Sequence, residues 1–291
     1  MTHRLLLDTA SLLYRAFYAL PTSLTDGEIP VNAVRGYVDM TARAVAERRP
    51  DEVWHCRDDE ERPAARVAAW PDYKAERPPE PADLTAQLPL LDRVLGALGA
   101  RQASAPGWEA DDVIGRLVAD AGAEDRIEVV TGDRDLLQLV RDRAPSVRVL
   151  FTVRGVSEIE EFDVAAVHAR HGVPPERYVD YAILRGDPSD GLPGIAGVGE
   201  KTARRLVTSY PDLDALLADT GALSPRLAER LAAAGGYVEA MRAVVPVRRD
   251  VDLVVDHGER DDAAAAALAA AHNLDGPVRR LREALDAGAA R

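Results

Sequence analysis

The sequence predicts an α/β protein with a mainly parallel sheet flanked by helices. Three short apolar runs each end in polar residues; they span residues 4–8, 51–58 and 126–133. Segments with helical periodicity separate or follow these runs, at residues 33–48, 82–98 and 110–121. Alternation of this kind is typical of a parallel sheet with helices packed on it. With 291 residues, of which 47% are hydrophobic, the chain is long enough to bury a large core.

The individual elements follow from their local patterns. The runs "RLLLD" at 4–8, "DEVWHCRD" at 51–58 and "RIEVVTGD" at 126–133 predict strands. The run "RVLF" at 148–151 predicts an additional edge strand. The segment 110–121 predicts an amphipathic helix that docks one face on the sheet. That face consists of Val113, Ile114, Leu117, Val118 and Ala121.

The rest of the chain divides by composition. Residues 59–83 are dense in charge and contain five prolines, and a connection this long is either disordered or functional. Beyond about residue 174 the sequence predicts only short helices and a glycine-rich turn, followed by an Ala-rich helical tail. We therefore expect a core at residues 1–173, a helical region at 174–260 and a tail at 261–291.

Composition also limits the possible sites. The single cysteine, Cys56, excludes disulfides within the chain and cysteine-based zinc clusters, and the six histidines form no HExxH pattern. Any metal ion would therefore be bound by oxygen atoms. The first residues contain neither a signal peptide nor a membrane span, so we expect a cytoplasmic protein. The net charge of -13 argues against a polyanionic partner, unless the acids are concentrated in a pocket apart from a basic track.

Acidic residues gather at the ends of predicted strands and at the start of one helix. They are Asp8, Asp58, Asp133 and Asp135 after the strands, and Glu109, Asp111 and Asp112 at the helix start. Acidic first turns also cap helices, and a single acid after a strand is usually a turn residue. Because ligands of open parallel sheets bind beyond the carboxyl ends of the strands, we expect several acids placed there to converge.

Converging carboxylates favour a divalent cation. Like charges in a partly dry cleft repel one another, so such a cluster either takes up protons or binds cations. With no soft ligands, the choice is Mg²⁺ or Mn²⁺. Two such ions stabilise both the attacking and the leaving oxygen of a phosphoryl displacement, which points to phosphodiester hydrolysis.

Two other phosphate chemistries are rejected. The segment "LLLDTAS" is similar to an aspartyl-phosphate phosphatase motif but has Ala10 where that motif needs a second aspartate. The segment "GIAGVGEKT" is similar to a phosphate-binding loop, but Glu200 interrupts the required Gly-Lys pair and no strand precedes it.

Five motifs together carry a resemblance to a known family. They are "LLLDTASLLYRAFYALP", "YKAERPP", "GWEADDVIGRL", "TGDRDLLQLV" and "GDPSDGLPGIAGVGEKTA". In this order and spacing, over residues 4–210, the sequence closely resembles the structure-specific 5' nucleases. These are the flap endonucleases and the 5'-3' exonuclease domain of bacterial DNA polymerase I. The resemblance implies a PIN-like core, a helical arch and a C-terminal helix-hairpin-helix region.

The resemblance also implies two metal sites. The first comprises Asp8, Asp58, Glu109, Asp111 and Asp112, and the second Asp133, Asp135, Asp187 and Asp190. Asp111 would lie between them and act in catalysis. Asp187 and Asp190 come from the resemblance alone, because "GDPSD" by itself predicts an ordinary turn.

In this family the connection that corresponds to residues 59–83 forms an arch through which a single-stranded 5' end passes. Lys74 and Arg77 would then face the scissile phosphate as catalytic and DNA-binding residues. Arg15 matches a basic residue that follows the first strand in the family, and the resemblance implies that it binds DNA. Taken singly, Lys74 and Arg77 would be interpreted as solvated surface charges.

The hairpin turn is expected to bind duplex DNA. Its glycines, Gly194, Gly197 and Gly199, allow the backbone to approach a phosphate and donate N–H groups, with Lys201 beside them. A monovalent cation such as K⁺ often completes this type of contact in the family. The contact is independent of sequence.

We therefore expect a divalent-metal-dependent 5' nuclease that cuts 5' flaps and 5' ends of DNA in replication and repair. The alternative is a catalytically weak, structure-specific DNA-binding protein of the same fold, and a third hypothesis is a related ribonuclease. Because no polymerase domain follows, we expect a free-standing nuclease or an isolated domain. We also expect a monomer that does not bind membranes and that has a functional link to a DNA polymerase and a ligase.

Overall fold

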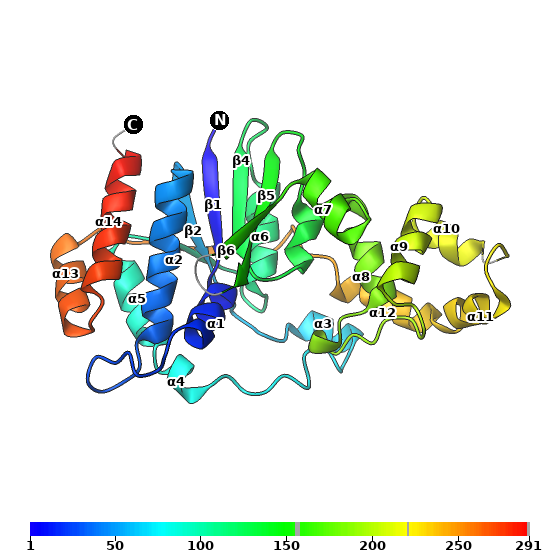
Figure 1. Cartoon of the computed structure of the whole chain (residues 1–291), viewed down its shortest axis with the longest axis horizontal. Helices are drawn as coiled ribbons and strands as arrows, with labels where there is room; N and C mark the ends of the chain where they lie inside the picture. Colours follow the sequence, from blue (N-terminus) through cyan, green and yellow to red (C-terminus); the bar gives the residue numbers. More distant parts are fainter. Residues whose placement is uncertain (155–157, 220, 290–291) are drawn as a thin grey trace.

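The computed structural model describes residues 1–154, 158–219 and 221–289, and its centre is a seven-stranded sheet (Figure 1). The strands are β1 (His3–Asp8), β2 (Glu52–Cys56), β3 (Arg101–Ser104), β4 (Arg126–Thr131), β5 (Ser146–Arg154), β6 (Glu158–Phe162) and β7 (Val254–His257). Their order across the sheet is β6-β5-β4-β1-β2-β3-β7. Strands β1 to β5 are parallel, and the two edge strands are antiparallel to their neighbours. The predicted fold class is confirmed.

The strands predicted at 4–8, 51–58 and 126–133 correspond to β1, β2 and β4. The strand predicted at 148–151 lies within β5, but it is not at the edge of the sheet because β6 pairs with it. Strands β3, β6 and β7 were not predicted. Register aligns Asp8 of β1 with Cys56 of β2, so the residues that follow both strands leave the sheet at the same end.

Helices cover both faces of the sheet because side chains alternate along each strand. In β1, Leu5 and Leu7 belong to one buried cluster and Leu6 to the other. The first face is covered by α1 (Thr9–Ala19), α2 (Asn32–Arg48), α5 (Leu88–Ala97), α13 (Asp262–Ala271) and α14 (Asp275–Ala289). The second face is covered by α6 (Ala110–Ala119) and α7 (Val164–His171).

A group of helices extends from one end of the molecule (Figure 1). It comprises α8 (Tyr178–Arg185), α9 (Glu200–Ser209), α10 (Leu213–Ala218), α11 (Pro225–Ala233) and α12 (Gly235–Val244). The chain then returns to the core, where β7 pairs with β3. The expectation that residues 174–260 are all helical is therefore wrong at β7, whose pairing partner lies about 150 residues away in the sequence. The expected tail is helical, and its helix α14 packs along α2.

The segment expected to form the arch contains little helix. Between residues 59 and 83, α3 (Ala64–Ala69) is the complete helix that the structure describes, and α4 (Ala82–Thr85) begins at the end of the segment. Between them the chain runs along the lower edge of the molecule in Figure 1. Proline cannot donate a backbone hydrogen bond, so the prolines of this segment interrupt helix formation.

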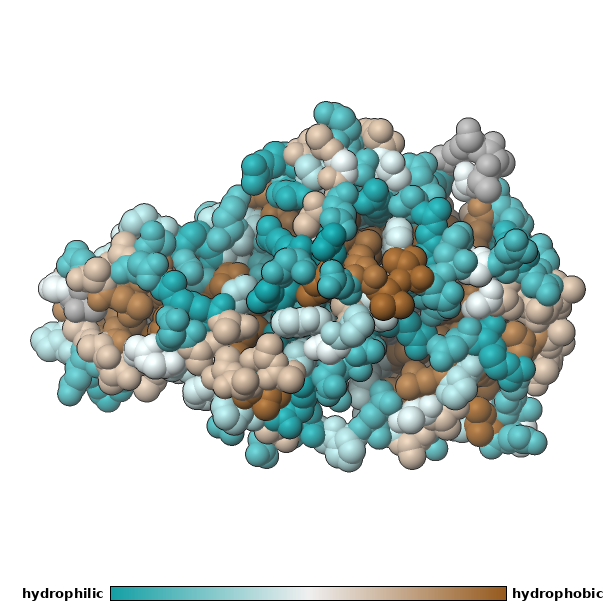
Figure 2. Space-filling view, turned by 180° about the vertical axis from the view of Figure 1, so that it is seen from behind, coloured by the Kyte–Doolittle hydropathy of each residue, from teal (hydrophilic) through white to brown (hydrophobic). Residues whose placement is uncertain are grey.

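One face of the molecule is largely polar. Figure 2 shows hydrophilic residues over most of the face seen from behind, with apolar groups gathered in limited patches. Among the described residues, the large hydrophobic side chains that are exposed are Met1, Tyr18, Val153, Ile159, Val254 and Val255. Within the described ranges, no helix combines the length and the apolar character needed to cross a membrane.

One close contact fixes helix α6 to the segment that follows α12. A Cβ atom at Gly115 would lie 2.2 Å from the backbone oxygen of Arg248 and 2.5 Å from a methyl group of Val247. Both distances are shorter than any van der Waals contact. The absence of a side chain at Gly115 therefore lets the two segments touch.

We expect Gly115→Ala to lower the free energy of unfolding by about 1–3 kcal/mol, because the added methyl group forces the backbone apart. The control is Gly96→Ala on α5, where no atom lies within 4 Å of the added Cβ. There alanine should be neutral or stabilise the helix by about 0.5–1 kcal/mol. Urea-induced unfolding followed by circular dichroism compares the two. Equal changes would contradict a tight contact at Gly115.

Candidate active site

An acidic cleft of about 650 Å³ lies at the carboxyl ends of the central strands. Eight of the nine predicted metal-binding acids line it: Asp8, Asp58, Glu109, Asp111, Asp133, Asp135, Asp187 and Asp190. Asp59, Glu61 and Glu80 add further carboxylates, and Arg57, Lys74, Arg77 and Arg134 are the cations of its wall. The cleft thus gathers residues from β1, the start of α6, the end of β4, the arch segment and the loop after α8.

Asp8 is held where β1 ends and α1 begins. One carboxylate oxygen accepts a hydrogen bond from the Ser11 backbone N–H at 3.1 Å, which caps α1, and the other accepts from the Thr131 hydroxyl at 2.6 Å. Thr131 also accepts from the backbone N–H of Asp133 at 2.9 Å. Burial and repulsion from Asp58 raise the pKa of Asp8 to about 7. Thr131 therefore links two predicted ligands.

The acids at the start of α6 have different environments. Asp58 accepts a hydrogen bond from the Ala110 backbone N–H at 2.6 Å, so this acid caps the helix from another segment. In the described part of the chain, Asp111 has no hydrogen bond or ion pair. Burial and repulsion from Asp133 and Asp8 raise its pKa well above the ordinary value. Asp111 is therefore a carboxyl group of the cleft lining without a partner in the described residues, and its surroundings disfavour its charged form.

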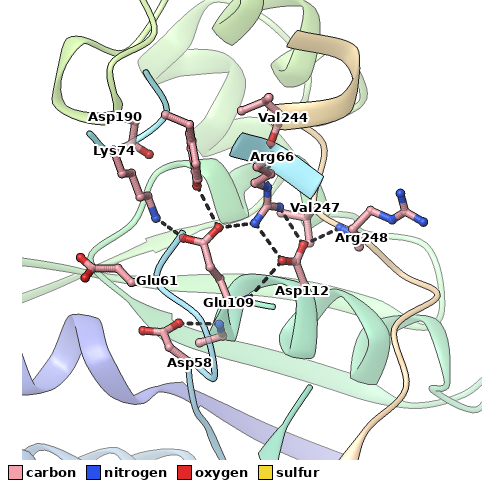
Figure 3. A network of polar contacts seen from close by, with 12 residues as sticks. Asp58, Glu61, Arg66, Lys74, Glu109, Asp112, Asp190, Val244, Val247 and Arg248 are labelled. Atoms are coloured by element: carbon pink, nitrogen blue, oxygen red, sulfur yellow. Dashed lines mark hydrogen bonds and ion pairs between the residues drawn. The ribbon is translucent and has the colours of Figure 1, made fainter. Parts of the chain in front are cut away.

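Asp112, which is predicted to belong to the first metal site, does not line the cleft. It is fully buried, and Arg66 donates to both of its carboxylate oxygens at 2.8 Å (Figure 3). The Arg248 backbone N–H also donates to it at 2.9 Å. Its neighbour Asp111 points elsewhere, because successive side chains on a helix are about 100° apart. The structure thus separates two acids that are adjacent in sequence.

The second predicted group combines β4 with the loop after α8. Asp133 accepts from the Asp135 backbone N–H at 2.8 Å, and Asp187 accepts from the Ser189 N–H at 3.0 Å. Burial, followed by repulsion from Asp133, Asp190 and Asp187, raises the pKa of Asp135 well above its usual value. The four acids therefore influence one another across the cleft, although sequence alone indicated only a turn at 186–190.

Two cations of the arch segment are paired with acids of the cleft. The Lys74 ammonium forms an ion pair with Glu109, and the Arg77 guanidinium donates to Asp190 at 2.6 Å. The Lys74 backbone N–H donates to the Asp190 carbonyl at 2.9 Å. Burial alone lowers the pKa of Lys74, but Glu109 and other nearby anions hold it well above its usual value. Both cations are thus charged and compensate part of the negative potential.

The other predicted DNA-binding residues lie outside the lining of the cleft. Arg15 donates to the Val153 carbonyl at 3.2 Å, at the end of β5. Lys201 is exposed in the first turn of α9, which begins after Gly199. Gly194 and Gly197 precede it with φ of +68° and +74°, a backbone conformation that favours glycine. The turn therefore adopts a shape that side chains at these positions would oppose.

Sequence reasoning missed two residues of this site. Thr131 could have been found as a hydroxyl at the end of a strand, two residues before Asp133. Arg66 lies within "AARVAA", and an isolated arginine among alanines gives no local indication that it becomes buried. Its role depends on partners more than 40 residues away.

The donor set fits a hard divalent cation, because every candidate ligand in the cleft is a carboxylate. Several of these groups are buried and repel one another, as the raised pKa values of Asp58, Asp133 and Asp135 indicate. Among the residues that the structure describes, no three acidic, histidine or cysteine side chains form a ready-made metal centre. Lys74 and Arg77 instead pair with two of the acids.

Comparisons with known proteins cover nearly the whole chain. Residues 3–172 match the family model of the "5'-3' exonuclease, N-terminal resolvase-like domain", and residues 173–267 match that of the "5'-3' exonuclease, C-terminal SAM fold". A 5'-3' exonuclease of Streptomyces coelicolor is 44% identical over 97% of this chain and 100% of its own length. One of Mycobacterium tuberculosis is 39% identical over 97% of each chain. The T5 D15 protein, solved with metal ions, has the same fold, with a TM-score of 0.66, 15% identity, and coverage of 98% of this chain and 99% of that one.

In metal-free buffer, Asp8→Asn should raise the melting temperature at about pH 8 and leave it nearly unchanged at about pH 4. The pKa of Asp8 is about 7 in the folded chain against an ordinary 3.8, so the folded chain retains a proton that the unfolded chain has released. The resulting cost to stability is absent below about pH 4, grows as the pH rises, and is complete above about pH 7. Asparagine still caps α1. Thermal unfolding with a chelator tests this; equal shifts at both pH values would contradict it.

Proposed function

This chain belongs to the 5'-3' exonuclease family and is a 5' nuclease, and from that premise we propose that it hydrolyses phosphodiester bonds at 5' flaps and 5' ends of DNA. The observation that carries the proposal is the cleft in which eight carboxylates face two cations of the arch segment. The name of the two exonucleases that are 39% and 44% identical supports the direction of attack. The reaction would serve replication and repair.

The acids of the cleft would hold two divalent ions, Mg²⁺ or Mn²⁺. The first would be bound by Asp8, Asp58, Glu109 and Asp111, and the second by Asp133, Asp135, Asp187 and Asp190. When bound, such ions stabilise the charge on the attacking and leaving oxygens of a phosphoryl displacement. Asp112 is left out of this assignment, because Arg66 occupies both of its oxygens.

The residues of the chain have separate roles in this proposal. Asp111 has no partner of its own in the described part of the chain and lies near both Asp8 and Asp133, so it would contribute to both groups. Lys74 and Arg77 would leave their carboxylates when cations arrive and donate to the scissile phosphate instead. Their positive charge then stabilises the charge that develops there.

The hairpin turn before α9 would hold the duplex. Its backbone N–H groups and Lys201 would contact phosphates, with a K⁺ ion completing the site. This contact reads no base edges, so the enzyme would recognise DNA shape. The protein would act as a monomer, and cleavage of a flap leaves an end that a polymerase and a ligase process further.

The alternative, a catalytically weak DNA-binding protein, is not favoured. Such a protein has no use for buried carboxylates that raise one another's pKa. In the cleft, the pKa values of Asp8, Asp111 and Asp135 are raised, so their ionisation lowers the stability of the fold. An enzyme that binds cations there explains it.

Cleavage of a labelled 5' flap should stop in chelator and recover with Mg²⁺ or Mn²⁺, whereas Ca²⁺ should bind without supporting turnover. Asp111→Asn should lower the cleavage rate by about 100-fold or more, because a group that stabilises the transition state is lost. Binding of the flap in Ca²⁺, measured by fluorescence anisotropy, should change little. Undiminished turnover of this variant would overturn the assignment.

Lys74→Ala and Arg77→Ala should each lower the single-turnover rate by about tenfold or more, because each removes a charge that stabilises the phosphate in the transition state. The matched control is Arg279→Ala on α14, whose side chain is 70% exposed and does not line the cleft. Metal binding should survive in all three variants. If the two arch variants cut at the rate of the control, Lys74 and Arg77 have no part in catalysis.

Lys201→Ala should weaken binding to flaps and to plain duplex alike, whereas Lys74→Ala should affect mainly substrates with a free 5' end. For each phosphate contact, a plot of the logarithm of affinity against the logarithm of salt concentration should have a slope of about -0.9. Because few phosphates would be contacted, the total dependence on salt should be modest. Titrations of flap, duplex and single-stranded oligonucleotides at several salt concentrations measure this. The same pattern of losses for both variants would refute separate roles.

A further inference from the structure

A buried arginine of the arch segment lies behind the acidic cleft. The Arg66 side chain on α3 is only 4% exposed, and each of its three nitrogens has a partner (Figure 3). Nε donates to the Val244 carbonyl at 3.0 Å, and the two terminal nitrogens donate to Asp112 at 2.8 Å each. One terminal nitrogen also donates to Glu109. Arg66 thus joins the arch segment, the start of α6 and the end of α12.

Asp112 is the main partner of Arg66 in this contact between the arch segment, α6 and α12, and it also bonds to other groups. Besides the two bonds from Arg66, it accepts from the Arg248 backbone N–H at 2.9 Å and from the Glu109 backbone N–H at 3.4 Å. The close approach at Gly115 brings the segment 247–248 against the same helix. Asp112 therefore has no free oxygen, and withdrawing it would leave a buried guanidinium without its main counter-ion.

The two carboxylate oxygens of Glu109 have different partners. Its Oε2 accepts from Arg66 and, at 2.8 Å, from the Tyr73 hydroxyl, while its Oε1 faces Lys74. Glu109 lines the cleft, whereas Arg66 and Asp112 do not. The two bonds on Oε2 fix the orientation in which Oε1 is presented. Groups that orient a ligating carboxylate typically matter for metal affinity.

We propose that Arg66 is a positioning residue of the cleft, which orients Glu109 for metal binding, and that Asp112 is the counter-ion of Arg66 and not a metal ligand. This inference rests on the proposed function, because it takes Glu109 as a ligand. It assigns opposite roles to the adjacent acids Asp111 and Asp112. The two roles predict stability changes of opposite sign.

The first test is thermal unfolding in chelator. Asp112→Asn should lower the melting temperature by several degrees, because the charge of buried Arg66 is no longer balanced. Asp111→Asn should leave it unchanged or raise it, because repulsion among the carboxylates is relieved. An unchanged or raised melting temperature for Asp112→Asn would overturn the role given to Asp112.

The second test is binding of Mn²⁺ without DNA, followed by electron paramagnetic resonance well below the melting temperatures. Asp112→Asn should bind Mn²⁺ with the stoichiometry and nearly the affinity of the wild type, since asparagine still accepts a bond from Arg66. Asp111→Asn should lose about tenfold or more in affinity. The double variant Arg66→Met/Asp112→Leu, which carries no buried charge, should also bind about tenfold or more weakly, because Glu109 is no longer oriented.

The matched control is Glu128→Gln on β4. Glu128 is fully buried and paired with Arg48 and Arg126, but it does not line the cleft. This variant should lose stability and keep its Mn²⁺ affinity, which separates stability from metal binding. Wild-type affinity in the double variant would overturn the positioning role of Arg66.

The outcomes also separate this inference from the proposed function. A wild-type chain that binds no Mn²⁺ would overturn the metal site and, with it, the role of Arg66. A wild type that binds Mn²⁺, with Asp112→Asn impaired as severely as Asp111→Asn, would overturn the inference and leave the proposed function intact.

Discussion

Repulsion among carboxylates in one cleft is the constraint on which the rest of this structure depends. Burial and mutual repulsion raise the pKa values of Asp8, Asp58, Asp111, Asp133 and Asp135. The fold opposes this cost with backbone N–H donors, the Thr131 hydroxyl and the arch cations, each of which favours a negative charge nearby. Burial of these carboxylates therefore lowers the stability of the fold at this point, and under the proposed function bound divalent cations would restore it.

The same distribution explains how an acidic chain acts on a polyanion. The net charge of -13 would repel DNA if it were spread evenly. Instead, many acids face the cleft, where metal ions would neutralise them, and Lys74 and Arg77 lie at its wall. The field that a phosphate meets is then set by these cations and by the hairpin turn, so net charge is a poor guide to the partner.

Sequence patterns predicted the elements whose formation depends on residues close together in the chain. The strands that lead to Asp8, Asp58 and Asp133 have apolar runs, and their parallel pairing places their acids at one end of the sheet. Three strands were not predicted from such patterns. Strand β3 is short and begins with Arg101 and Gln102, and β6 is the acidic "EIEEF". Strand β7 depends on pairing with β3, which is distant in the sequence. Asp111 and Asp112 are adjacent acids of the same type, and they are distinguished by the partners of Asp112, chiefly the distant Arg66 and the Arg248 backbone N–H.

The return of the chain to the core at β7 affects how firmly the helical region is held. The helical region leaves the core after α7 and rejoins it where β7 pairs with β3, and in between it also contacts α6 at Gly115 and α3 at Arg66, so it is held at several points and not by a single linker. Because these contacts belong to one continuous buried cluster, they oppose rotation of the helical region relative to the core. Under the proposed function, DNA held by the hairpin turn would therefore stay at a nearly constant distance from the acidic cleft. The fold would then fix the number of nucleotides between the place where the duplex is bound and the place where it is cut.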